Sequence, residues 1–136
     1  MKWVTWENVG VDRIGCAWLI RRQIDPMAEF LFIPRGGTVP ADAEPFDIPG
    51  VRFSHHAGHC SFHALITHYK LTDPVLIRIA RIIDEADTVQ SVNVEPAASG
   101  LDLISEGLRL ISPDDVTAIE RGSLVYDALY ARLLHS

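Results

Sequence analysis

The chain has 136 residues, of which 48% are hydrophobic and 22% are charged, and this composition can build one well-buried core. Its formal net charge of −6 argues against non-specific binding to nucleic acid, so we expect no direct binding of duplex DNA. Two cysteines are too few for a disulfide scaffold, and no apolar run in the sequence is long enough to cross a membrane. We therefore expect a cytoplasmic protein with a single domain over residues 1–136 and no membrane partner.

The first part of the chain predicts strands around one helix. Residues 2–8 alternate and are rich in aromatic and β-branched residues, which is typical of a strand. Apolar residues then recur at helical spacing until Asp25-Pro26 ends the pattern. We expect a strand at 2–8, a helix at 11–24, a strand at 28–34, a loop with three prolines and two glycines at 35–49, and a third strand at 50–56.

The second part of the chain predicts helices. Residues 60–71 place apolar side chains on one stripe, with Ser61 near the N-cap, and Asp73 with Pro74 marks the start of a helix over 73–87. Further helices are expected at 97–111 and 112–136, with Gly122 as a candidate break in the last one. Since the strands come early and the helices late, the predicted class is α+β, with a small N-terminal sheet of about three strands followed by about five helices.

A window rich in histidine, "SHHAGHCSFHALITHY" at 54–69, holds five of the six histidines and one of the two cysteines. Neutral imidazole suits Zn, Cu, Fe and Ni, and two histidines with one carboxylate occur in zinc and non-haem iron sites. The short turn before Asp73 should make the two flanking helices antiparallel and bring Asp84 beside the start of the first. We therefore predict a divalent metal, zinc or iron, with His55, His63 and Asp84 as ligands and Cys60 and His59 close by. The alternative is a solvated polar helix start.

Three segments together resemble a known family. "DRIGCAWLIRRQID", "SHHAGHCSF" and "YDALYA" are similar to the ChrB C-terminal domain family, known from chromate-resistance operons, and the resemblance covers about residues 9–133. It implies a role in the bacterial chromate response. Longer members, linked to regulation of efflux operons, carry an additional N-terminal region that is absent here, so we do not expect a DNA-binding regulatory role to carry over.

Two positions depart from the family's usual pattern. His63 stands where the family's "CSFE" has Glu, and Asp84 stands where its "IVHGAD" has His. Together the two changes leave one imidazole and one carboxylate, an exchange that a metal site would tolerate.

Arginines and cysteines offer further candidates. Arg13, near a helix N-terminus, is chemically suited to a tetrahedral oxyanion such as chromate, although solvent or a structural ion pair with Asp12 is the favoured explanation. Arg21 and Arg22 complete this weaker oxyanion candidate, with complementation of the helix dipole as the alternative. Cys16 is expected to be a small buried hydrophobe, whereas Cys60 is either buried or reactive.

Three functions remain open from the sequence. The first is a metal-binding accessory protein in chromate or metal-stress response. The second is a non-enzymatic module that senses chromate or another oxyanion and acts through a partner. The third is a metal-dependent reductase or hydrolase, so the sequence does not decide whether the protein is an enzyme. The chain is also compatible with a homodimer.

Overall fold

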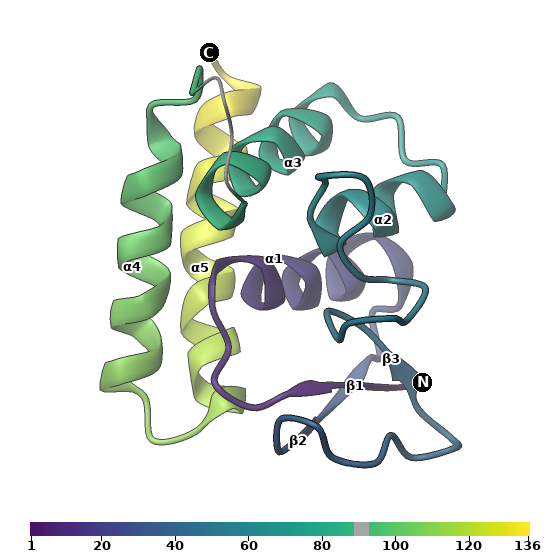
Figure 1. The fold of residues 1–136 in the computed structure, drawn as a ribbon. Helices are drawn as coiled ribbons and strands as arrows, with labels where there is room; N and C mark the ends of the chain where they lie inside the picture. Colours follow the sequence, from purple (N-terminus) through teal and green to yellow (C-terminus); the bar gives the residue numbers. More distant parts are fainter. Residues whose placement is uncertain (89–92) are drawn as a thin grey trace.

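A computed structural model describes residues 1–88 and 93–136, and within them it contains a small parallel sheet and five α-helices (Figure 1). The elements in chain order are β1 (Lys2–Trp6), α1 (Val11–Leu19), η1 (Ile20–Ile24), β2 (Glu29–Ile33), β3 (Glu44–Pro45), α2 (Ser61–His68), α3 (Pro74–Asp87), α4 (Ala97–Ile111) and α5 (Asp115–Leu134). The predicted α+β class is confirmed.

The sheet has the strand order β2-β1-β3, with β1 parallel to both neighbours. A parallel pair needs a long crossover, and α1 with η1 supplies it between β1 and β2. The helix predicted at 11–24 is therefore present, but its last turn is π-helical, since the amide of Asp25 donates to the carbonyl of Ile20 at 2.7 Å.

The third strand is not where the sequence placed it. Residues 44–45, inside the predicted loop at 35–49, form β3, whereas the predicted strand at 50–56 contributes isolated bridges, from Phe53 to Phe46 and from His56 to His59. Asp47 and Gly50 have φ values of 51° and 86°, so the chain turns sharply between the two phenylalanines. The alternating pattern of residues 50–56 therefore reflects the burial of Phe53 in the core, and no continuous β-ladder forms there.

Helix α1 is central to the fold. Figure 1 shows it between the sheet on one side and α2 and α3 on the other, with the antiparallel pair α4 and α5 along its flank. Gly15 allows Tyr126 of α5 to approach, and an added Cβ at Gly122 would lie 2.3 Å from the side chain of Ile14. Gly122 is thus a point of close helix packing, and the predicted break there is wrong because α5 is continuous.

Local caps fix the starts of two helices. The side chain of Asp73 accepts from the amide of Val75 at 2.9 Å, with Pro74 as the first helical residue, as predicted. Asp114 accepts from the amide of Thr117 at 2.8 Å and starts α5. In the described part of the chain, no helix combines the length and the apolar character needed to span a membrane.

Candidate metal centre

A buried carboxylate at the start of α1 organises the site. Asp12 is 2% exposed, and its two oxygens accept the backbone amides of Ser61 at 2.8 Å and Phe62 at 3.0 Å. Those amides belong to the first turn of α2, whose N-cap residue, Cys60, makes no side-chain cap. Asp12 therefore supplies from α1 the acceptor that the N-terminus of α2 lacks locally.

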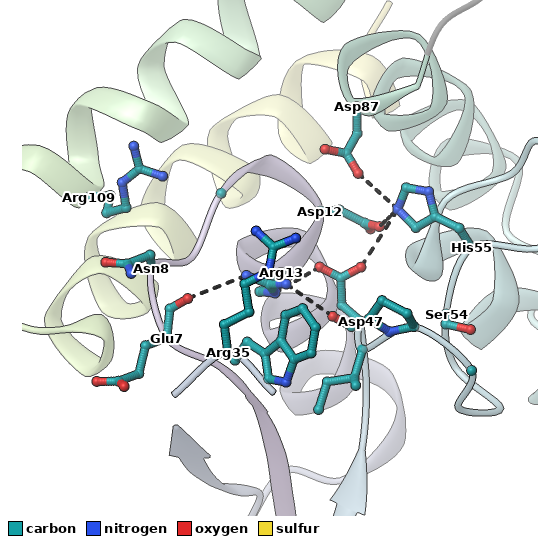
Figure 2. A pocket seen from close by; sticks show the side chains of 15 residues that line it. Glu7, Asn8, Asp12, Arg13, Arg35, Asp47, Ser54, His55, Asp87 and Arg109 are labelled. Atoms are coloured by element: carbon teal, nitrogen blue, oxygen red, sulfur yellow. Dashed lines mark hydrogen bonds and ion pairs between the residues drawn. The ribbon is translucent and has the colours of Figure 1, made fainter. Parts of the chain in front are cut away.

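The same carboxylate faces His55, which lies just after the bridge of Phe53. The Nε2 atom of His55 lies 3.1 Å from Asp12 Oδ2 and 3.0 Å from Oδ2 of Asp87, at the end of α3 (Figure 2). One ligand atom from each of these three residues lies within 4.8 Å of the other two. Oδ1 of a further carboxylate, Asp47, is 3.7 Å from the same nitrogen.

This arrangement favours a cation between the carboxylates. The hydrogen bond to Asp12 raises the pKa of His55 to about 9, against the opposing effect of burial. Burial raises the pKa of Asp47 to about 8, and the charge of Asp12 adds to the effect. Burial likewise raises the pKa of Asp87, with Asp12 as the next cause. Without a metal, a proton on His55 is the cation that offsets this local negative charge.

Asp47 connects the site to Arg13. Its Oδ2 lies 3.0 Å from Nε of Arg13, whose Nη2 also donates to the Asp47 carbonyl at 3.2 Å. Ser61 donates its hydroxyl to the other carboxylate oxygen at 2.6 Å. The expected alternative of an ion pair between Arg13 and Asp12 is wrong, because Asp47, at positive φ in the turn, reaches the guanidinium instead.

An open cavity of about 660 Å³ borders the Asp12, His55 and Asp87 group. It is lined by Trp6, Glu7, Asn8, Gly10, Asp12, Arg13, Arg35, Asp47, Ile48, Pro49, Gly50, Ser54, His55, Asp87 and Arg109. This volume is within the usual range of small-molecule pockets, roughly 300–1,000 Å³. The three candidate ligand residues are therefore accessible to more than a bare ion.

The predicted metal ligands are divided between two places. His55 belongs to the cavity, whereas His59 Nδ1 lies 2.9 Å from Asp84 Oδ2, and the ring of His63 stacks on that of His59 at 4.0 Å between centroids. Asp84 does lie beside the start of α2, as expected, and accepts the amide of Cys60 at 2.7 Å. Metal binding by His59, His63, Asp84 and Cys60 stays a prediction.

Both cysteine thiols are buried. Cys16 has no exposed surface, and its thiol lies 3.5 Å from Asp12 Oδ1, in keeping with the expected small hydrophobe. The thiol of Cys60 is equally buried and lies 3.7 Å from the carbonyl of Ala80. Burial raises the pKa of both thiols, so neither is readily ionised.

Two of the three oxyanion candidates lie away from the cavity lining. Arg21 donates to the carbonyl of Ala28 at 3.2 Å, and Arg22 pairs with Asp127 at 3.0 Å. Only Arg13 of that set lines the cavity.

Sequence reasoning missed Asp87 and the role of Asp12. A signal for each was present: Asp12 shares a helix face with the apolar Cys16 and Leu19, and Asp87 follows Asp84 by one turn on α3. A carboxylate on an apolar face is rarely buried without a partner. The partner itself, His55, comes from a loop 43 residues away, which periodicity cannot reveal.

Comparison with known proteins agrees with the resemblance in the motifs. Residues 3–133 match the family described as ChrB, C-terminal domain. The chain is 36% identical over 130 residues to Protein ChrB of Cupriavidus metallidurans, a match that covers 95% of this chain and 40% of the relative. We found no solved structure that matches. Because the family match spans nearly the whole sequence, the chain belongs to the ChrB C-terminal domain family.

Proposed function

We propose that this protein binds one divalent metal ion through Asp12, His55 and Asp87 and acts as a metal-binding accessory protein in chromate or metal-stress response. The observation that carries the proposal is the position of His55 Nε2, 3.1 Å from Asp12 Oδ2 and 3.0 Å from Asp87 Oδ2. Tetrahedral zinc bonds of about 2.0–2.1 Å separate neighbouring ligand atoms by roughly 3.3 Å. The two separations from His55 Nε2 are therefore close to those of a tetrahedral zinc site.

The donor set supports zinc or iron. One imidazole nitrogen and two carboxylate oxygens are ligands that both metals accept, and three protein ligands leave a position for water or a bound molecule. That position would face the cavity, since all three residues line it. The same opening is the observation that favours the second candidate, a metal-dependent reductase or hydrolase.

The oxyanion-sensing alternative through Arg13, Arg21 and Arg22 has less support. The guanidinium of Arg13 is held by Asp47, and the other two arginines contact Ala28 and Asp127. A sensor built on these three residues would need them at one place. Direct binding of duplex DNA is still not expected, given the net charge of −6.

Elemental analysis of the gently purified protein tests the proposal. We expect zinc or iron to approach one ion per chain in the wild type and to fall severalfold in Asp87→Asn. The matched control is Glu120→Gln, which removes one negative charge from an exposed position on α5 and should keep the wild-type metal content. A wild-type protein that is metal-free and also fails to bind added zinc would overturn the proposal.

A further inference from the structure

The cavity beside the candidate metal centre is much larger than a hydrated ion needs. Its volume is about 660 Å³. Figure 2 shows His55 and Asp87 on one side of the cavity and Arg109 on the other, with Arg35 between them in this view. Asp12 and Asp87 lie on the side of His55, whereas the other side carries Arg109 together with Glu7.

Arg35 and Arg109 differ from Arg13 in their partners. Whereas Arg13 is tied to Asp47, neither of the other two guanidinium groups makes an ion pair or hydrogen bond with any residue of the described ranges 1–88 and 93–136. Arg35 lies over the ring of Trp6, 5.5 Å from its centroid, which leaves its N–H groups available. Guanidinium groups that line a cavity without a carboxylate partner are suited to bind an anionic group.

A bound metal would also favour an anionic ligand in this cavity. Four carboxylates line it, and so do four basic side chains: Glu7, Asp12, Asp47 and Asp87 against Arg13, Arg35, Arg109 and His55. A bound divalent ion would add positive charge to this mixed set. The metal-loaded cavity therefore attracts an anion more strongly than the metal-free one does.

Apolar surface completes the lining. Trp6, Ile48 and Pro49 contribute it, so a ligand with a hydrocarbon body between two polar ends suits the cavity better than a compact inorganic ion.

We propose that the cavity binds a small organic dicarboxylate, with one carboxylate on the metal and the other held by Arg35 and Arg109. This inference rests on the proposed metal site. Because binding linkage is reciprocal, the dicarboxylate should tighten zinc binding by the same factor by which zinc tightens dicarboxylate binding.

Isothermal titration provides the test. Zinc is first titrated into the wild type, Arg35→Gln and Arg109→Gln, and then malonate, succinate, glutarate and adipate are titrated into each zinc-loaded protein. We expect similar zinc affinities for all three proteins and one preferred dicarboxylate length. The preferred compound should bind at least about tenfold more weakly to either arginine variant, since a hydrogen bond to a charged group contributes about 1.5–3 kcal/mol.

Three controls distinguish the explanations. Arg132→Gln, which removes the same charge outside the cavity lining, should bind the dicarboxylate as the wild type does. Monocarboxylates should bind weakly and equally to the wild type and both cavity variants. Sulfate stands for an inorganic oxyanion, and sulfate binding as tight as that of the best dicarboxylate would overturn the organic assignment.

The two proposals fail in different ways. If zinc binds but dicarboxylate affinity is unchanged in Arg35→Gln and Arg109→Gln, the dicarboxylate proposal is overturned and the metal site stands. If zinc does not bind to the wild type, the metal site and the dicarboxylate proposal that rests on it both fall.

Discussion

His55 and His59 are four residues apart in the sequence, and each contacts a carboxylate, but their surroundings in the fold differ. Around His55, three carboxylates from α1, α3 and the loop after β3 approach one ring nitrogen and open onto a cavity. Around His59, the contacts run in a row, from Asp84 to His59 and from His59 to the stacked ring of His63. Residue type alone does not make a metal centre, because the ligand atoms must also converge on one point.

A carboxylate in each region caps the N-terminus of α2. Asp12 accepts the amides of Ser61 and Phe62, and Asp84 accepts the amide of Cys60. Asp12 and Asp84 therefore both stabilise the fold, whereas metal binding is proposed for the His55 group. Experiments can separate these two roles.

The largest expected effect is on stability. Asp12→Ala should lower the free energy of unfolding of the metal-free protein by about 3 kcal/mol, because it leaves two buried amides without their acceptor and removes one of the carboxylates that face the imidazolium of His55. Asp84→Ala should cost less, about 1–2 kcal/mol, because His59 is half exposed and water can replace part of that contact. Urea unfolding with a chelator present measures both, and equal losses would contradict the ranking.

Zinc affinity should separate the two histidine groups. We expect His55→Ala to weaken zinc binding by at least about 100-fold, because it removes the nitrogen ligand, whereas His63→Ala should change it by less than about threefold. Competition against a chromophoric chelator measures both variants under identical conditions. The reverse order would assign the metal to the His59, His63 and Asp84 group.

The pH dependence of zinc binding sharpens the same distinction. The pKa of His55 is about 9 in the metal-free protein, so the ion must displace a proton from this ring at neutral pH. Zinc affinity should therefore rise about tenfold per pH unit between pH 6 and pH 8 and level off above pH 9. Burial lowers the pKa of His63, so a site that used this ring as its titrating ligand would already level off within that range.

The smallest expected effect is that of His59→Ala. Its side chain is 49% exposed, and its contact with Asp84 resembles a surface ion pair, so the loss in unfolding free energy should be about 0.5 kcal/mol. Thermal and urea unfolding beside the wild type will measure it. A loss above about 2 kcal/mol would show that the stacked histidines carry more of the fold than their exposure suggests.

The features that were predicted correctly from the sequence depend on residues that are close together in the chain. Asp73 with Pro74 identified the start of α3 because a cap and its amide lie within a few residues. The expected return of Asp84 to the start of α2 also followed from a short turn between two helices.

What the sequence did not predict depends on distant segments. The strand β3 exists because residues 44–45 reach the backbone of β1, and the following turn at Asp47 and Gly50 carries Phe53 back beside Phe46. The group of Asp12, His55 and Asp87 likewise joins three segments whose convergence no local pattern encodes. Arg35 and Arg109 line the cavity for the same reason.

The first amides of α2 are capped by side chains of other helices, and this affects the order in which the chain folds. An isolated helix of eight residues is too short to persist in water, and the first amides of this one depend on carboxylates from α1 and α3. Helix α2 should therefore form only as its two neighbours dock. The amide hydrogens of Cys60, Ser61 and Phe62 should exchange with solvent deuterium mainly through global opening, which makes them reporters of the assembled tertiary structure.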